Sequence, residues 1–332
     1  MDTLTHIMTG LAVGQLFSDK KESPRFRPLL WGAVAANIPD LDTVFQLFLS
    51  TENSMLFHRG ISHSLFLWIL CSPLLALCIN KIYKGNRYTC RKWLKISVIA
   101  WFLHILMDIF NTYGTGIFEP FSHLRVAYDA VNVIDLFVLI PLLVMVIMFV
   151  CAVKDYAKKT MTALAVVMYP LLYICAAVFI KMEVEYKGEI QLINQHIFPD
   201  RVITSPLPLS PLAWKVVAET EEGYYTGVFY GFWKEQTKYT YMPKNKFLES
   251  KYLFNPKYRQ LKQFTQGWYL LEQIDGQVYM YDLRFTTLDP GKYALNFKLH
   301  LDENYNLTAE RTSPNRHITF KNTVELFKRL AN

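Results

Sequence analysis

The chain has 332 residues, of which 52% are apolar, and it carries a formal net charge of +7. Its mean hydropathy of +0.13 is too high for an ordinary soluble enzyme and favours a membrane domain joined to a soluble domain. The sequence contains no nucleic-acid-binding motif, so we predict that the partner of this basic chain is the lipid bilayer and not nucleic acid.

Apolar stretches long enough to cross a membrane occupy much of the first 181 residues. Three of them lack charged residues and approach the roughly 20 residues that a helical span requires, namely 61–80, 136–153 and 160–180. Two more, 28–50 and 96–113, are interrupted only by a few ionisable residues. The stretch 4–17 is short, and either a tight membrane helix or an interfacial helix fits it. We therefore predict an α-helical polytopic membrane domain at residues 1–181 with five to six transmembrane helices.

Basic residues gather in alternate loops of this predicted domain. They are frequent in 20–27, 81–95 and 154–159 and scarce in the loops between. Because basic loops face the cytoplasm, the pattern predicts a multi-pass protein of the cytoplasmic membrane. If 4–17 crosses, six crossings place the amino terminus and everything after Lys181 on the outer side. The other five spans keep this orientation even if 4–17 does not cross.

The composition changes after Lys181. Several prolines, from Pro199 to Pro211, indicate a mostly irregular connector, which we place at residues 182–215. Short aromatic and β-branched runs follow, and Asp275-Gly276 between two of them predicts a tight hairpin. We predict a small β-rich (α+β) extramembrane domain at 216–332, with helical spacing of apolar residues at 322–330.

Ionisable side chains cluster in or beside the apolar stretches of the first domain. Their burial is costly unless they bind one another, a metal ion or water. The predicted topology brings all of them near the outer membrane face, which indicates one shared site. They are His6, Asp40, Asp42, His58, Arg59, His63, His104 and Asp108.

Two of these clusters can supply metal ligands from neighbouring positions. His104 and Asp108 are four residues apart, so on a helix they share one face. The alternative is a hydrogen bond that only satisfies two buried polar groups. Asp40 and Asp42 follow Pro39, which interrupts a helix. Both can bind a cation, or one can bind while the other accepts a proton from water; alternatively, Asp40 only caps the next helix.

The third cluster combines imidazoles with a cation. His58 and His63 flank Gly60, which suits a turn, and Arg59 beside them suggests an anion contact next to a metal site. The alternative is that these histidines are polar side chains at the level of the lipid headgroups. His6 has the weakest chemical case, because a single histidine on a short helix is more often a packing residue.

The clusters occur within recognisable motifs. The chain contains, in order, Met1-Asp2-Thr3-Leu4-Thr5-His6, Ile38-Pro39-Asp40-Leu41-Asp42, His58-Arg59-Gly60-Ile61-Ser62-His63 and His104-Ile105-Leu106-Met107-Asp108. Over roughly residues 1–150 this pattern resembles the YdjM-like family of bacterial inner-membrane predicted metal-dependent hydrolases. The resemblance implies a metal site and a location in the bacterial inner membrane.

Together, the residues and the resemblance predict a membrane-bound metal-dependent hydrolase. We expect it to act on a phosphoester or other ester of a lipid or lipid-linked substrate at the outer face of the membrane. Asp42 would accept the proton of a metal-bound water, and Arg59 would hold the anionic group of the substrate. One or two zinc or manganese ions would be bound by His58, His63, His104, Asp108 and Asp40, with His6 as a further ligand.

A second hypothesis needs no catalysis. In it, the same histidines and carboxylates form an ion-binding or ion-passage site in a non-enzymatic membrane protein, and the exterior domain binds a partner. The two hypotheses require different access to the site. A hydrolase needs a ligand position left to water and facing a substrate, whereas a carrier needs a polar path to the second membrane face.

Overall fold

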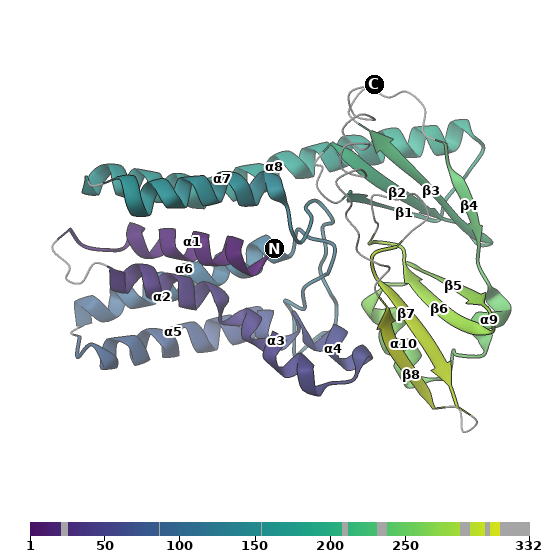
Figure 1. Ribbon diagram of the computed structural model, residues 1–332, viewed down its shortest axis with the longest axis horizontal. Helices are drawn as coiled ribbons and strands as arrows, with labels where there is room; N and C mark the ends of the chain where they lie inside the picture. Colours follow the sequence, from purple (N-terminus) through teal and green to yellow (C-terminus); the bar gives the residue numbers. More distant parts are fainter. Residues whose placement is uncertain are drawn as a thin grey trace. The chain divides into compact units, whose positions relative to one another are not determined.

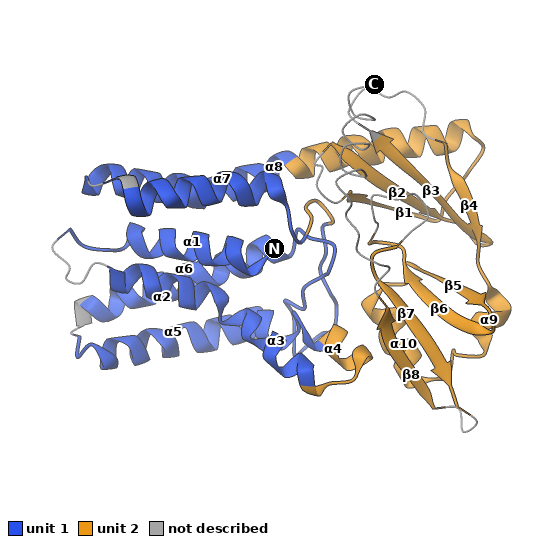
Figure 2. Cartoon of the chain, in the orientation of Figure 1, with its two compact units in different colours: residues 1–47, 57–128, 133–176 blue, residues 48–56, 129–132, 177–332 orange. Residues whose placement is uncertain are grey.

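The computed structural model describes residues 1–20, 26–85, 87–153, 155–207, 212–230, 238–285, 293–302 and 306–312. The chain divides into two compact units (Figure 2). Unit 1 comprises residues 1–47, 57–128 and 133–176, and unit 2 comprises 48–56, 129–132 and 177–332. Unit 1 is helical, whereas unit 2 contains the strands (Figure 1). A helical amino-terminal part followed by β structure is thus confirmed.

The helices of the first half of the chain vary widely in length. They are α1 (Thr3–Leu16), α2 (Phe26–Asn37), α3 (Asp42–Phe45), α4 (Thr51–Phe57), α5 (Leu65–Ile82), α6 (Arg87–Asp108), α7 (Leu136–Ile147) and α8 (Tyr156–Asn194). Short 3₁₀ turns lie between some of them, namely η1 (Pro39–Leu41), η2 (Gln46–Phe48) and η3 (Ile61–His63). Within unit 1, α1 packs on α2, and α6 packs on both α2 and α5 (Figure 1).

In the described part of the chain, two helices are long and apolar enough to cross a membrane, α5 and α8. Only 17% of the apolar window of α5 and 33% of that of α8 is buried in the structure, so most of these apolar residues stay at least partly exposed. The apolar helix at Leu136–Cys151 is shorter. The predicted span 28–50 is divided, because α2 ends at Asn37 and Pro39 begins a 3₁₀ turn. By length and composition the structure therefore supports two spans, fewer than the five to six expected.

Glycines allow α1 and α2 to approach closely. A Cβ added at Gly10 would lie 2.4 Å from the carbonyl oxygen of Gly32, and one added at Gly14 would lie 2.1 Å from that of Pro28. Gly10 and Gly14 are four residues apart and so share one face of α1. Small residues at this spacing are typical of closely packed membrane helices. The contact holds α2 in place, and α2 leads directly to Pro39 and Asp40.

The strands described in unit 2 form two antiparallel sheets. The first has the order β1-β2-β3-β4 and the second β5-β6-β7-β8. Ile203 and Val217 of the first sheet share a buried apolar cluster with Leu270 of the second. The strands are β1 (Arg201–Pro206), β2 (Ala213–Glu219), β3 (Gly223–Tyr230), β4 (Thr240–Pro243), β5 (Tyr269–Ile274), β6 (Gln277–Asp282), β7 (Asn296–Leu301) and β8 (Leu307–Thr312). Two helices, α9 (Lys246–Ser250) and α10 (Pro256–Phe264), connect the sheets.

Asp275 and Gly276 form the predicted hairpin turn. Ile274 pairs with Gln277, and both turn residues have positive φ, at 50° and 77°. Such angles at both positions favour a two-residue turn with Gly at the second, so this prediction is confirmed. The stretch 182–215 is more ordered than predicted, since it contains the end of α8, strand β1 and the start of β2. Domain boundaries at residues 181 and 215 stay a prediction, and residues 208–211 and 322–330 lie outside the described residues.

Candidate metal centre

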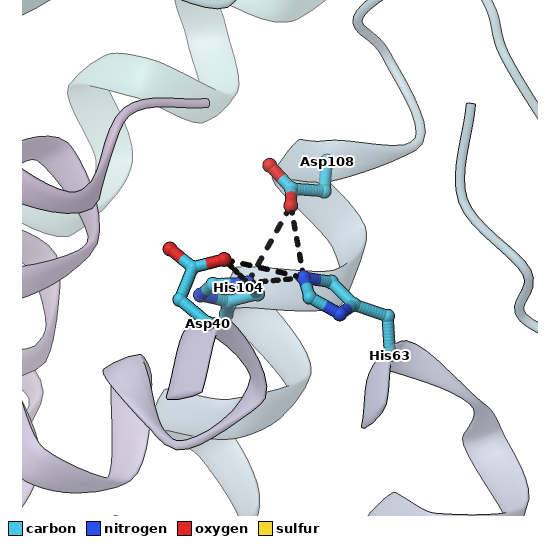
Figure 3. Close-up of side chains that lie close together, drawn as sticks. All are labelled: Asp40, His63, His104 and Asp108. Carbon is cyan, nitrogen blue, oxygen red and sulfur yellow. Dashed lines mark hydrogen bonds and ion pairs between the residues drawn. The ribbon is translucent and has the colours of Figure 1, made fainter. Parts of the chain in front are cut away.

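Four predicted ligands come together at the ends of helices in unit 1 (Figure 3). Asp40 lies in the turn η1 that follows α2, and His63 is the last residue of η3. His104 and Asp108 lie on the last turns of α6. One ligand atom from each of the four residues lies within 4.8 Å of every other. The group is buried and could hold a metal ion.

The two imidazoles face each other through their Nε2 atoms, which are 2.9 Å apart. Asp40 Oδ1 lies 3.5 Å from His63 Nε2 and 3.6 Å from His104 Nε2. Asp108 Oδ2 lies 3.4 Å from the same two nitrogens. Two nitrogen and two oxygen atoms thus converge on one small volume (Figure 3).

The chemistry of these atoms fits a cation. His104 Nδ1 lies 2.6 Å from the carbonyl oxygen of Ala36, which only accepts hydrogen bonds, so this nitrogen carries the hydrogen. In the neutral ring, His104 Nε2 therefore presents a lone pair. Asp108 Oδ2 is buried and accepts no hydrogen bond. Buried polar atoms rarely lack a hydrogen bond. A divalent ion bound between His104 Nε2 and Asp108 Oδ2 would satisfy both atoms.

The simple His104–Asp108 hydrogen bond considered from the sequence does not describe this geometry well. Their closest atoms, His104 Nε2 and Asp108 Oδ2, are 3.4 Å apart, beyond the roughly 2.7–3.2 Å of an N–H···O hydrogen bond. Asp108 Oδ1 instead faces His6 Nε2 at 3.2 Å and the amino group of Met1. Asp108 Oδ1 thus faces His6 and Met1, whereas its Oδ2 faces His63 and His104.

His58 lies outside the group of four. It forms a second group with Asp40 and Asp42, whose ligand atoms also lie within 4.8 Å of one another. Its Nδ1 is 2.8 Å from Asp42 Oδ1. The Asp42 carboxylate also accepts hydrogen bonds from the backbone N–H of Arg59 and from the hydroxyl of Ser62. His58 is partly exposed, whereas Asp42 is buried.

His6 stacks on His104, with ring centroids 3.8 Å apart. Its contacts are with Asp108 and His104, and it belongs to neither ligand group in the described part of the chain. His6 Nδ1 is buried without a hydrogen-bond partner. The structure thus brings His6 to the site as a neighbour of two of the four residues.

Arg59 is buried beside the group, and its φ of 59° lies in the left-handed region, which costs a residue with a Cβ about 1–2 kcal/mol. Its Nε lies 3.2 Å from Asp108 Oδ2, and its Nη2 donates to the carbonyl oxygen of Met1. Its guanidinium lies over the ring of Tyr113, and Nη1 has no hydrogen-bond partner. A strained backbone position of this kind is typical of functional sites.

Sequence reasoning missed two contributors to the site, Ser62 and the carbonyl group of Ala36. Ser62 lies inside the motif that contains His58 and His63, so its position was available, but a serine hydroxyl has no distinctive spacing. The Ala36 carbonyl oxygen lies in the last turn of α2, where carbonyl groups have no partner within the helix. No residue pattern identifies such a backbone acceptor.

Comparisons with known proteins agree with the resemblance found in the sequence. The profile of the YdjM inner membrane protein family matches residues 1–184. The chain is 25% identical over 236 residues to the uncharacterized protein YfhP of Bacillus subtilis (strain 168), covering 68% of each chain. It is 29% identical over 141 residues to the inner membrane protein YbcI of Escherichia coli (strain K12), covering 39% of this chain and 78% of that protein. No solved structure matches the chain.

Proposed function

The chain belongs to the YdjM inner membrane protein family, and from this premise we propose that it is a membrane-bound metal-dependent hydrolase. Its substrate is a phosphoester or other ester of a lipid or lipid-linked molecule, taken from the outer face of the cytoplasmic membrane. The observation that carries the proposal is the buried group of Asp40, His63, His104 and Asp108. Membership of an inner membrane family associates the chain with the lipid bilayer.

A donor set of two imidazoles and two carboxylates suits zinc or manganese. In our proposal Asp40, His63, His104 and Asp108 hold the ion, and His58 together with Asp40 would contribute to a second one. When bound, the ion would supply a Lewis acid and lower the pKa of a coordinated water towards neutrality. His6 acts in this arrangement through Asp108, whose Oδ1 it contacts.

Arg59 is the residue that we propose for holding the anionic group of the substrate. Its Nη1 has no hydrogen-bond partner although it is buried, and a guanidinium matches the geometry of carboxylate and phosphate oxygens. Asp42 as the acceptor of the water proton stays a prediction from the sequence. Its two oxygens already accept hydrogen bonds from His58, Arg59 and Ser62, which supports a different role for it.

An apolar surface next to the ligands supports a lipid as the substrate. The segment of residues 41–47, which follows Asp40 in unit 1, contains several large apolar side chains that are exposed. Leu47 is 83% exposed and Phe45 is 58% exposed, which is unusual for such residues unless they contact a membrane or a partner. This placement would let acyl chains stay in the bilayer while the ester group reaches the buried site.

The membrane topology is part of the same proposal. We propose five to six spans, with the β-rich part outside, because the basic loops of the sequence alternate with loops poor in basic residues. The short helices α1 and α2 would lie within the bilayer by packing on each other and on α6. Irregular backbone at membrane depth, as at Pro39, is tolerated where it is buried in protein.

The alternative function, ion passage, requires a polar path from the site to the other membrane face. Both groups of candidate metal ligands found among the described residues include Asp40, so they lie at one place. This arrangement favours a site that is open on one side only, and therefore a hydrolase.

Metal analysis of the purified full-length protein in detergent tests the proposal. We expect stoichiometric zinc or manganese in the wild type, and its loss in His104→Ala and Asp108→Ala, because each removes one of four converging ligands. His123→Ala, at an exposed position, is the matched control and should keep its metal. A folded wild type without bound metal, or unchanged metal content in both ligand variants, would contradict the metal centre.

A further inference from the structure

Asp42 is buried next to the group of four and joins two of the site's histidines. His58 Nδ1 lies 2.8 Å from its Oδ1, and Ser62 Oγ lies 2.5 Å from its Oδ2. An ionised carboxylate only accepts hydrogen bonds. The His58 imidazole therefore donates the hydrogen of the first contact, and the Ser62 hydroxyl donates that of the second.

The direction of the Ser62–Asp42 hydrogen bond determines the direction of the hydrogen bond between Ser62 and His63. Because the Ser62 hydroxyl donates to Asp42, its oxygen faces His63 as an acceptor, and His63 Nδ1 lies 2.9 Å away. His63 therefore carries its hydrogen on Nδ1. The neutral ring then has its lone pair on Nε2, the atom that faces His104 Nε2 at 2.9 Å. A ring with the hydrogen on Nε2 could not bind a cation there.

We propose that Asp42 and Ser62 are positioning residues of the metal centre. Asp42 fixes the tautomer of His58 directly and that of His63 through the Ser62 hydroxyl, so that Nε2 of His63 presents a lone pair to the ion. The assignment rests on the metal centre of the proposed function. In this assignment the Ser62 oxygen accepts the Nδ1 hydrogen of His63, just as the Ala36 carbonyl oxygen accepts that of His104. Each acceptor thereby leaves the Nε2 lone pair of its ring for the ion.

Zinc affinity of the full-length protein in detergent, measured by competition with a chromogenic chelator, tests this assignment. We expect Ser62→Ala to weaken zinc binding about 10- to 100-fold, the usual effect of removing a group that orients a ligand. Ser62→Thr keeps the hydroxyl and should bind zinc as the wild type does. Asp42→Asn should weaken binding at least as much as Ser62→Ala, because it alters the acceptor for both histidines.

Ser72→Ala is the matched control. Ser72 is also buried, but its hydroxyl has no hydrogen-bond partner, so its loss should leave zinc affinity unchanged. If the wild type and Ser62→Ala bind zinc equally tightly, the positioning role is wrong while the metal centre stands. If the wild type binds no zinc or manganese, the proposed function and this assignment both fall.

A direct measurement keeps the assignment testable even if Ser62→Ala does not fold. The nitrogen chemical shifts of ¹⁵N-labelled histidine in the metal-free wild type distinguish the two tautomers, and a His63→Gln variant identifies the His63 signals. We expect a hydrogen on Nδ1 of His63. A hydrogen on Nε2 would overturn the proposal.

Discussion

The four histidines at this site differ in the groups that they contact. His63 and His104 belong to the group of four, His58 pairs with Asp42, and His6 stacks on His104. The sequence selected all four as candidate ligands because they occur beside apolar stretches. It had no means of separating them, because the difference depends on which nitrogen faces which acceptor.

The cost of burying a charge also acts on single residues of unit 2. Lys215 of β2 is buried, and burial lowers its pKa to about 7, an effect that the nearby Asp282 carboxylate only partly opposes. Its Nζ donates to the carbonyl oxygen of Leu283 and lies 4.3 Å from the centre of the Tyr293 ring. Arg284 forms an ion pair with Asp282, which leaves less of that negative charge for Lys215.

We expect the stability of wild type relative to Lys215→Met to rise by about 2 kcal/mol from pH 7 to pH 9. In this range the unfolded chain holds the Lys215 proton and the folded chain, with its pKa of about 7, releases it. The unfolded state thus binds more protons, so stability rises with pH. Thermal unfolding of full-length protein at both pH values measures this. The exposed Lys251→Met is the control, and an equal pH response in Lys215→Met and wild type would contradict the prediction.

At the scale of the elements, close packing of α1 on α2 determines where the ligands lie. α2 contributes the Ala36 carbonyl oxygen that contacts His104, and it leads to Asp40. Its position depends on Gly10 and Gly14 of α1, where no Cβ fits. The sequence predicted helices here, but it did not predict that two short helices would meet through glycine.

We expect Gly14→Ala to lower both stability and metal content. The new Cβ would lie 2.1 Å from the backbone oxygen of Pro28, so α1 and α2 must separate, at a cost of about 1–3 kcal/mol or more. Zinc analysis and a thermal unfolding curve in detergent measure both effects.

Gly188→Ala on α8 is the matched control for this change. Its Cβ would meet Val216 at 3.5 Å, an ordinary contact, and the higher helix propensity of alanine should stabilise the protein by up to about 1 kcal/mol. Wild-type stability and metal content in Gly14→Ala would show that the close approach of α1 and α2 does not position the ligands.

At the scale of the whole molecule, the chain combines a helical unit that carries the site with a unit built around two sheets. The proposed topology places the basic loop at 81–95 in the cytoplasm and the sheets outside. Of the two candidate spans in the described chain, α5 ends at this basic loop and α8 precedes β1.

Cysteine labelling in spheroplasts tests this topology. In a variant without the five native cysteines, Glu272→Cys on β5 should react with a membrane-impermeant maleimide in intact spheroplasts. Lys81→Cys, also exposed, should react only after lysis, because the bilayer separates it from the reagent. The reverse pattern would place the sheets in the cytoplasm, and labelling of both residues in intact spheroplasts would contradict the proposed topology.

The amino-acid sequence alone was enough to predict the family, the order of helical and β-rich parts, the Asp275-Gly276 hairpin and the identity of the clustered ionisable residues. The family follows from the resemblance of its ordered motifs, and the other features follow from composition, backbone periodicity and turn chemistry, which act over a few neighbouring residues. The folded chain was needed to show that His63 faces His104, that Asp42 contacts His58 and Ser62, and that Pro39 divides a predicted span. Those contacts depend on how segments distant in the chain pack together, and local residue patterns do not specify that packing.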